Sequence, residues 1–463
     1  MAQRINSKHY DVVVIGGGSA GIAAAVSAAR NGASTLLLES GPMVGGDLVS
    51  GLPVDGCLSS RGEWIVGGVA KELFDECRRY DGYIGPVNDY RSLYVVAVDP
   101  EVMKFAVVKL LHRYNVSVLL YTFAEDAVVE DGVIRGIAAV NKSGRMLITA
   151  DVFIDCGGDG DIAVLAGAPY EFGGPRGELQ PVSMVFRMCN VDAERLLRFV
   201  RDHPENFGLG ENPMIGLTKE QCAEALYRQG LPKAFMVAEG PLLGRAIAEG
   251  EMYRTSMLGI TPISLARKEV SINSTRMSGI SGIHTEQLSR SLPALLEQME
   301  VCIRFLKNRV PGFQDAVFSG IAPRIGVRET RRIMGDSILQ TEDVLEGRKR
   351  PDGIGKGGHE LDIHGSGTGH VRGIIKDAGS YDIPYGCLIP QRLENTLIAG
   401  RCLSATREAH SSARVMGTCM VMGQAAGTAA ALSLNYGGRV RAVPVERLRS
   451  KLREQGAILD GTL

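Results

Sequence analysis

Residues 10–21 read YDVVVIGGGSAG, an aliphatic run that ends in a glycine-rich turn. A continuous run such as residues 12–15 is typical of a strand buried in a parallel sheet. The spacing of Gly16, Gly18 and Gly21 permits a tight turn, close approach of the backbone to a pyrophosphate, and close packing of a helix on the strand. The stretch therefore predicts the start of a dinucleotide-binding βαβ unit.

The residues that follow complete this unit. An alanine-rich helix is predicted over residues 20–31, and its positive N-terminal end would face the phosphates. The second strand, residues 36–38, ends at Glu39, which lies 18 positions beyond Gly21 (39 − 21). An acid ~20 residues after the last glycine binds a ribose hydroxyl in such units. We therefore expect Glu39 to contact the ribose.

Length, charge and cysteine usage restrict the class of protein. At 463 residues the chain exceeds the ~250 to 300 residues at which one core usually stops growing, so a second domain or a large insertion is expected. Lys plus Arg number 51 against 52 for Asp plus Glu, which disfavours nucleic acid as a partner. The nine cysteines form no C-x-x-C pair, which disfavours a metal centre and favours a reducing cytoplasm over secretion.

One segment has the length and composition of a membrane span. Residues 415–438 carry no charge and contain Gly423 and Gly427 in G-x-x-x-G spacing. Polar residues such as Thr418 and Gln424 interrupt the run, however. We therefore expect a helix buried inside an α/β domain and no membrane span.

The rest of the chain divides into three parts. After a helix over 102–114 and a strand over 116–121, we expect a three-stranded meander (124–130, 133–141, 145–149) and then a buried strand, 152–155, that enters the glycine-rich turn 156–161. From residue 180 to 382 the pattern changes. A β segment is predicted over 182–189, helices over 193–202 and 292–308, and a polar binding loop or lid over 353–373. The closing part returns to α/β with a strand over 397–400.

Several motifs together resemble FAD-dependent oxidoreductases built like glutathione reductase, in the group with a split FAD domain and an inserted substrate domain. They are GGGSAG (16–21), VGGD (44–47), IDCGGDGD (154–161), GVRETRRIMGD (326–336), DIH (362–364), IPYGCLIP (383–390) and AGRCLSATREAHSSARVMGTCMVMGQAAGTAAAL (399–432). The last stretch is similar to the signature of the bacterial FAD-dependent oxidoreductase family, a relative of the fumarate reductase and succinate dehydrogenase flavoproteins.

The resemblance implies the fold class α/β, a Rossmann-like FAD-binding domain with a β-meander plus an inserted α+β domain. The expected boundaries are 1–179 and 383–463 for the FAD-binding domain and 180–382 for the inserted substrate domain.

The resemblance also implies FAD as the cofactor and names the residues that contact it. They are Gly16, Gly18, Ser19, Ala20 and Gly21 at the pyrophosphate turn, Glu39 and Ser40 at the adenosine ribose, Gly45, Gly46 and Asp47 near the flavin, Gly158 and Asp159 along the cofactor, Gly400 and Arg401 at the pyrophosphate, and Thr418 and Cys419 facing the ring.

No second G-x-G-x-x-G follows a predicted strand, so a separate NAD(P)H domain is not expected. One half-reaction would then take place between a small-molecule substrate and flavin N5, and the other would use a separate electron donor or acceptor. A transient nicotinamide site in the substrate cleft and assembly into a homo-oligomer both stay open.

Five residues are candidates for catalysis. Arg414, with His410 four positions before it, resembles the arginine that holds a substrate carboxylate in fumarate reductases; it could instead contact FAD or pair with Glu408. His364 resembles a substrate-contacting histidine near its useful pKa, with a structural role as the alternative. Arg328 or Arg331 could deliver protons, or both could belong to an ion-pair network.

The expected function is an FAD-dependent dehydrogenase that exchanges a hydride between a small acidic or carbonyl-bearing substrate and flavin N5. Two alternatives stay open. One is a fumarate-reductase-like reductase of an activated double bond, and the other is an electron-transfer flavoprotein subunit.

Overall fold

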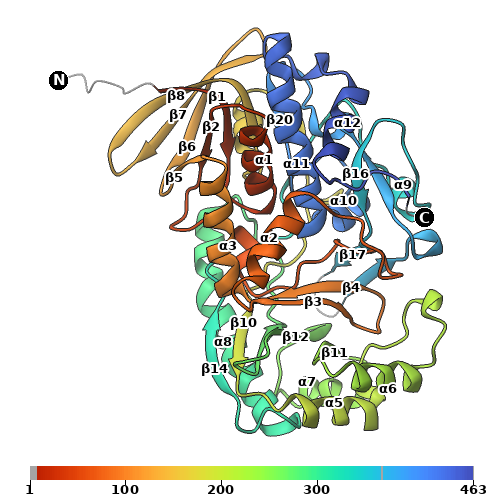
Figure 1. Cartoon of the computed structure of the whole chain (residues 1–463). Coiled ribbons are helices and arrows are strands. Elements are labelled where there is room, and N and C mark those ends of the chain that lie inside the picture. Colours follow the sequence, from red (N-terminus) through yellow and green to blue (C-terminus); the bar gives the residue numbers. More distant parts are fainter. Residues whose placement is uncertain (1–7, 366–368, 462–463) are drawn as a thin grey trace.

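A computed structural model describes residues 8–365 and 369–461 (Figure 1). Its larger sheet has seven strands in the order β5-β2-β1-β8-β7-β6, with β20 also paired to β8. These strands are β1 (Lys8–Ile15), β2 (Thr35–Leu38), β5 (Ser117–Leu119), β6 (Phe123–Glu130), β7 (Val133–Asn141), β8 (Gly144–Asp155) and β20 (Thr396–Ile398). The pairs β1–β2, β1–β8, β2–β5 and β8–β20 are parallel, as the α/β pattern predicts.

The predicted βαβ unit is confirmed. Strand β1 leads into helix α1 (Ser19–Arg30) and then into β2, with Val12 opposite Thr35 in the parallel register. Val12, Val13 and Val14 are fully buried because both faces of this strand are covered.

Helix α11 (Met416–Ser433) lies directly against α1 near the centre of Figure 1. A Cβ atom on Gly423 would lie 2.0 Å from the carbonyl oxygen of Ala20, and one on Gly427 would lie 2.0 Å from that of Ala24. The two glycines of the G-x-x-x-G motif therefore allow close contact between helices from opposite ends of the chain.

Among the described residues, no single helix is long and apolar enough to cross a membrane. One pair, α10 (Arg407–Ala413) with residues Met416–Tyr436, meets the length and composition criteria together but is bent by 91°.

The predicted boundary within the meander is wrong in one place. Residues 145–149 and 152–155 were expected as separate strands, but β8 is one continuous strand of 12 residues. Its first half pairs antiparallel with β7, and its second half pairs parallel with β1 and β20. The meander and the dinucleotide unit thus share one strand, since no glycine or proline lies between Met146 and Asp155.

A second, five-stranded antiparallel sheet has the order β11-β12-β13-β10-β14. Its strands are β10 (Phe186–Cys189), β11 (Ala234–Val237), β12 (Met257–Ser264), β13 (Glu269–Asn273) and β14 (Val317–Ile321). Four helices accompany it: α5 (Ala193–Asp202), α6 (Lys219–Gln229), α7 (Pro241–Ala248) and α8 (Thr285–Arg309). The first matches its predicted range, α8 starts earlier than predicted, and β10 is shorter than the predicted segment 182–189.

Several elements connect the two sheets. Helix α3 (Pro100–Arg113) begins at Asp99, whose side chain accepts a hydrogen bond from Glu101 N, and Glu101 pairs with Arg187 of β10 at 3.0 Å. The hairpin β3 (Tyr83–Asn88)–β4 (Tyr94–Val98) follows α2 (Val69–Arg78) and lies against β12. No sequence signal predicted this hairpin, and the predicted domain boundaries stay predictions.

The segment 353–373 was expected as a polar loop or lid. Its described residues form short strands instead, and residues 366–368 lie outside the described part of the chain. The strands are β16 (Gly353–Gly357), β17 (Leu361–His364) and β18 (His370–Gly373), and β16 pairs with β19 (Tyr381–Pro384). The remaining elements are α4 (Asp161–Leu165), β9 (Tyr170–Phe172), β15 (Arg331–Ile333), α9 (Thr341–Leu345) and α12 (Val445–Glu454).

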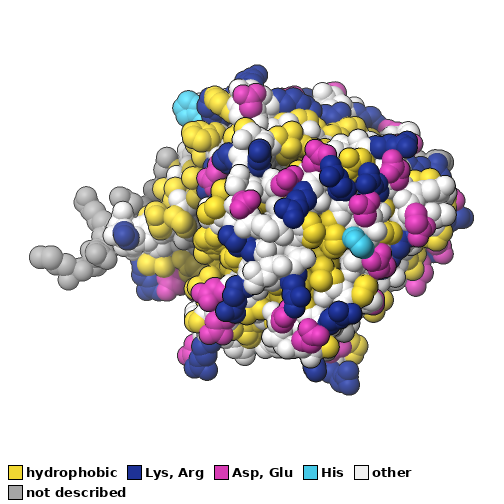
Figure 2. Space-filling model, turned by 90° about the horizontal axis from the view of Figure 1, so that it is seen from below, with side chains coloured by type: hydrophobic (Ala, Val, Ile, Leu, Met, Phe, Trp, Pro, Cys, Tyr) yellow, Lys and Arg dark blue, Asp and Glu magenta, His cyan; other side chains and the backbone are white. Residues whose placement is uncertain are grey.

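On the face that Figure 2 shows, basic and acidic side chains are interspersed.

Candidate active site

A cavity of about 680 Å³ runs along the carboxyl ends of β1, β2 and β8 to the start of α11 and to β17. The predicted cofactor residues that line it are Gly16, Gly18, Ser19, Ala20, Glu39, Ser40, Gly46, Asp47, Gly158, Asp159, Gly400, Arg401 and Cys419. Gly21, Gly45 and Thr418 were also predicted but are not among the lining residues. The carboxyl edge of a parallel sheet is where α/β folds bind ligands.

The three glycines of the first turn have different surroundings. Gly16 has φ +95°, and a Cβ there would lie 2.6 Å from the carbonyl oxygen of Cys156. A Cβ on Gly21 would lie 1.7 Å from the carbonyl oxygen of Gly16, whereas one on Gly18 would meet nothing within 4 Å. Gly16 and Gly21 are therefore required by the protein's own packing, and Gly18 leaves room for a ligand, as a pyrophosphate requires.

The Glu39 carboxylate is fixed on the wall of the same cavity. Its Oε2 accepts a hydrogen bond from the N–H of Gly17 at 2.8 Å, and its Oε1 accepts one from that of Gly41 at 2.7 Å. Each carboxylate oxygen can accept a second hydrogen bond. The carboxylate is held in place and can accept two further hydrogen bonds, which suits the two hydroxyl groups of a ribose.

The turn after β8 carries a charged pair. Arg401 Nη1 lies 2.8 Å from Asp159 Oδ1 and 2.7 Å from the hydroxyl of Thr330. Burial opposes ionisation of Asp159, but Arg401 outweighs it and holds the carboxyl pKa below its usual range. A Cβ on Gly158 would lie 2.7 Å from Arg401 Nη2, so glycine lets the guanidinium reach this place.

Helix α11 begins at the cavity wall. Val415, Met416 and Cys419 line the cavity, so the partial positive charge at the helix N-terminus faces it. Thr418 is fully buried on another side of the helix. Burial raises the pKa of the Cys419 thiol to about 12, so this side chain is uncharged at neutral pH.

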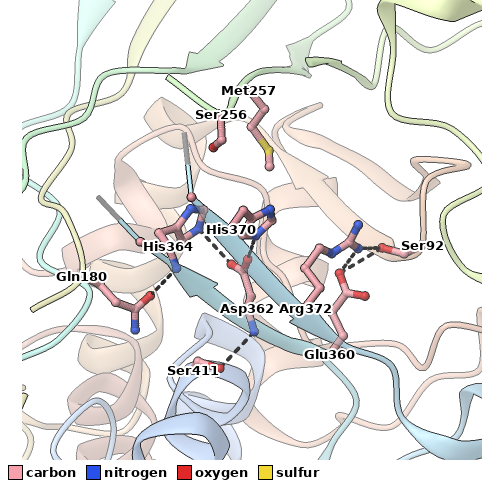
Figure 3. Close-up of polar contacts among 12 residues, drawn as sticks. Ser92, Gln180, Ser256, Met257, Glu360, Asp362, His364, His370, Arg372 and Ser411 are labelled. Atoms are coloured by element: carbon pink, nitrogen blue, oxygen red, sulfur yellow. Dashed lines mark hydrogen bonds and ion pairs between the residues drawn. The ribbon is translucent and has the colours of Figure 1, made fainter. Parts of the chain in front are cut away.

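At the other end of the cavity, the hairpin β17–β18 brings two imidazoles to one carboxylate (Figure 3). His364 Nε2 lies 3.0 Å from Asp362 Oδ2, and His370 Nε2 bonds to Asp362 Oδ1. The two rings are stacked, with centroids 4.9 Å apart and an interplanar angle of 13°. His364 and Asp362 line the cavity.

Two arginines complete this end. Arg414, the C-cap of α10, donates from Nη2 to the carbonyl oxygen of Asp362 at 3.2 Å and to Gln180 Oε1 at 3.4 Å. Arg328 donates from Nη1 to the carbonyl oxygen of Pro181 at 2.6 Å. Burial, together with the charge of Arg414, lowers the pKa of Arg328 to about 10, so it stays protonated at neutral pH.

The protonation of His364 differs from the expectation of a pKa near neutrality. Burial lowers the pKa of His364 to about 3, against the opposing effect of Asp362 and with the help of Arg328 and Arg414. Burial disfavours the ionised form of Asp362, but the two histidines outweigh it and keep that carboxyl pKa well below its usual range. At neutral pH, His364 is neutral and Asp362 is ionised.

Two predicted catalytic residues do not line the cavity. His410 is fully buried in α10, and its ring N–H at Nε2 donates to the carbonyl oxygen of Arg401 at 2.7 Å. Arg331 lies on β15, where it pairs with Asp161 at 2.5 Å. The catalytic roles of His410 and Arg331 stay predictions.

Other residues at the site were missed by the catalytic prediction. Asp362 precedes His364 by two positions, so on a strand both side chains lie on one face. The motif DIH contains this two-residue spacing, but the polarity of the surrounding segment predicts a loop, in which the spacing has no such meaning. Asp55 and His359 also line the cavity. No sequence pattern marks either of them.

The atoms of Asp362, His364 and His370 also lie within 4.8 Å of one another, a donor set that metal ions use. A cation there would face Arg414, whose Nη2 is 3.6 Å from Asp362 Oδ2. The surrounding positive charge favours hydrogen bonding over a metal ion.

Comparison with known proteins identifies the family of the chain. The model of the family described as FAD dependent oxidoreductase matches residues 11–452. A 68-residue segment, 14% of the chain, is 41% identical to NADH:fumarate oxidoreductase of Klebsiella pneumoniae (strain 342) and spans 7% of that relative's length.

Two solved structures match most of the chain at low identity. A geranylgeranyl bacteriochlorophyll reductase-like protein of Thermoplasma acidophilum has 14% identity and a TM-score of 0.48, with 98% of this chain and 85% of that one covered. The p-nitrophenol 4-monooxygenase of Pseudomonas putida has 11% identity and a TM-score of 0.47, with 97% and 85% covered. On the strength of the family match, the chain belongs to the FAD dependent oxidoreductase family, and it is an enzyme that uses FAD.

Proposed function

We propose that this enzyme is a dehydrogenase that exchanges a hydride between flavin N5 and a small organic substrate with an acidic or carbonyl-bearing group. The observation that carries the proposal is the charge at the β17 end of the cavity. Arg328 and Arg414 both face it. Among the described residues, Asp362 is the one carboxylate within 4.0 Å of Arg414, and none lies within that distance of Arg328.

An anionic substrate would balance this charge. With His364 neutral, the two guanidinium groups and the Asp362 carboxylate leave a net positive charge in a partly buried place. Charged groups in such places are normally paired. A guanidinium also matches a carboxylate or a polarised carbonyl oxygen geometrically. Arg414 Nε is buried without a hydrogen-bond partner among the described residues, which leaves it a donor that a substrate oxygen could use.

We further propose that the glycine-rich half of the cavity holds FAD. Gly18 would lie at the pyrophosphate, Glu39 at the adenosine ribose, Arg401 at the pyrophosphate from the opposite side, and Cys419 at the flavin end. FAD supplies a two-electron acceptor. The protein then needs to bind the substrate, exclude water and move one proton, and His364 is the group placed to move it.

The residues between positions 180 and 382 would form the substrate domain. Arg328 and His364 come from this part and Arg414 from the closing part, so the substrate end of the cavity would form where the two meet. The electrons would leave through a separate acceptor, since the sequence offers no second dinucleotide motif.

The reductase of an activated double bond is the second candidate. The segment identical at 41% to NADH:fumarate oxidoreductase favours it. The same arginines and histidine would serve in either direction, because forward and reverse reactions share one transition state. If the midpoint potential of the flavin is lower than that of the couple formed by the unsaturated compound and its saturated product, reduction of the double bond is favoured.

The test is anaerobic reduction of the purified holoenzyme, followed by the flavin absorbance, against hydroxy, amino and unsaturated acids, NADH and NADPH. We expect an acid to bleach the flavin. Arg414→Gln should retain FAD but need a much higher acid concentration, whereas Arg348→Gln, an exposed arginine paired with Glu346, should behave like the wild type. Bleaching by NAD(P)H alone would contradict the dehydrogenase and support the reductase, and an enzyme that no acid reduces would support an electron-transfer role.

A further inference from the structure

The Asp362 carboxylate has both oxygens engaged by imidazoles. Oδ2 faces Nε2 of His364 and Oδ1 faces Nε2 of His370, as the dashed lines in Figure 3 show. The backbone N–H of Asp362 donates to the hydroxyl of Ser411 at 3.0 Å, which fixes the strand beneath the carboxylate. One acid therefore sets the orientation of two histidines.

The chemistry of these contacts fixes where the imidazole protons lie. An ionised carboxylate can only accept hydrogen bonds. Burial opposes ionisation of Asp362, but its two imidazole partners outweigh it and hold the carboxyl pKa well below its usual range. Arg414 Nη2 lies 3.6 Å from Oδ2. Each Nε2 must therefore carry the proton that it donates. A neutral imidazole carries one N–H, so Nδ1 of a neutral His364 is unprotonated.

The free nitrogen of His364 is available to a ligand. Among the described residues, Nδ1 of His364 has no hydrogen-bond partner, and the residue lines the cavity next to Arg328 and Arg414. The ring cannot turn freely because it stacks on His370. Arg276 Nη2 also donates to the carbonyl oxygens of Gly365 at 2.8 Å and Gly369 at 3.0 Å, which anchors the backbone next to the two histidines.

We propose that Asp362 is a positioning residue that keeps the proton of His364 on Nε2, so that Nδ1 is the acceptor of the substrate's proton. This inference rests on the proposed function and deepens it. As the substrate is oxidised, an O–H, N–H or neighbouring C–H bond loses its proton to Nδ1, and the electron pair of that bond forms the new double bond. A hydride then leaves the adjacent substrate carbon for FAD with the electron pair of its own C–H bond, so FAD is reduced by two electrons. The resulting imidazolium keeps its Nε2 proton toward Asp362, which stabilises the new charge.

The charged groups around His364 determine the stability of its imidazolium form. Asp362 on the same strand favours the imidazolium, while Arg328, from the segment after β14, and Arg414, from α10, oppose it. A bound anionic substrate would offset both arginines. Before the reaction, Nδ1 of His364 is unprotonated and can accept a proton, as substrate oxidation requires. Substrate reduction would instead require a proton on Nδ1 at the start.

The first test reads the tautomer directly. The holoenzyme is labelled with ¹⁵N-histidine and measured by long-range ¹H–¹⁵N correlation at pH 7, and the signal of His364 among the eight histidines is assigned with His364→Gln. We expect a protonated Nε2 and an unprotonated Nδ1. A proton on Nδ1 alone, or an imidazolium, would overturn the proposal.

The second test removes the carboxylate. Asp362→Asn should retain FAD and lose the fixed tautomer, with flavin reduction at least about 100-fold slower, as other enzymes with a disordered histidine tautomer show. Glu360→Gln, directly before β17, is the matched control, since the Glu360 carboxylate bonds to Arg372 and Ser92 and, among the described residues, to no histidine. Reduction by Asp362→Asn at the control's rate would overturn the role of Asp362.

Two further results keep the test decisive. If Asp362→Asn does not fold, His370→Phe keeps the aromatic stack on His364 and should leave the His364 tautomer unchanged; loss of that tautomer would overturn the assignment to Asp362. One equivalent of a transition metal in the purified enzyme, lost in His370→Phe, would also overturn it. If His364 carries its proton on Nε2 but no acid reduces the flavin, the tautomer assignment holds and the proposed substrate class is wrong.

Discussion

The two ends of the cavity are built differently. At the β1 end much of the wall is backbone and small side chains from the first βαβ unit, including Gly16, Gly18 and Ser19. At the β17 end it consists of long charged or titratable side chains from three separate segments, represented by Arg328, His364 and Arg414. The first end is suited to a ligand shared by many proteins, and the second to the substrate of this one.

The difference shows which property each end depends on. Backbone shape at the β1 end is set by steric fit, so a single added methyl group has a large effect. Charge balance at the β17 end is set by long side chains, so a substitution there changes affinity or proton transfer while leaving the fold intact. The predictions below test this division.

The largest effect is expected in the glycine turn. Gly21→Ala places a Cβ 1.7 Å from the Gly16 carbonyl oxygen, so overpacking should cost about 3 kcal/mol or more and abolish FAD binding. Gly18→Ala meets nothing within 4 Å and should keep the stability of the FAD-free protein while weakening FAD affinity. Thermal unfolding and FAD titration of the two variants measure this contrast. Equal loss of stability in both would break the comparison.

At the charged end, Arg414→Gln and Arg328→Gln should each raise the KM for the acidic substrate about 10- to 100-fold. Each removes one charge-assisted contact worth about 1.5 to 3 kcal/mol. FAD content and melting temperature should stay close to the wild type. Steady-state kinetics with the acid found by flavin bleaching provides the measurement, and loss of FAD in either variant would move that arginine to the cofactor.

The neutral state of His364 should appear in the pH dependence of stability. Its pKa is about 3 in the folded protein and about 6.5 when exposed, so below pH 6.5 the unfolded chain binds more protons. Folding stability from this group is therefore complete above pH 6.5 and is lost as the pH falls toward 3.

From pH 7 to pH 5 the wild type should lose about 2 kcal/mol more than His364→Gln. Chemical unfolding of both proteins at the two pH values measures the difference. Parallel losses would mean that His364 titrates normally.

The smallest effects on turnover are expected for the two residues that lie outside the cavity. His410→Asn removes the hydrogen bond to the Arg401 carbonyl, and Arg331→Gln removes the pair with Asp161. Both should lower the melting temperature with less than about threefold change in kcat, since loss of a hydrogen bond or a partly exposed ion pair affects mainly stability. A large fall in kcat with FAD bound would restore the catalytic role that their sequence positions suggested.

The sequence predicted the β1 end well because its determinants are local. Strand, turn, helix and second strand lie within 30 positions, and each glycine has a short-range steric reason. The boundary of β8 was harder to place, because one strand serves two kinds of pairing. The five-stranded sheet was mostly missed since its antiparallel pairs join residues as far apart as Phe186 and Ile321.

The charged end was predicted only in part. His364, Arg328 and Arg414 were chosen by resemblance and do line the cavity, but Asp362 was not chosen because its role depends on pairing with β18. His410 and Arg414 were expected to act together through their four-residue spacing. Helix α10 ends at Ala413, however, so Arg414 turns toward the cavity while His410 stays inside the helix packing.

The contact of α11 with α1 constrains the order of events during synthesis. The ribosome releases the glycine turn and α1 nearly 400 positions before the segment that covers them. Until Gly423 and Gly427 emerge, the alanine-rich face of α1 has no partner from α11, and the flavin end of the cavity has no wall. A nascent chain should therefore acquire FAD only after residue 433 has left the ribosome.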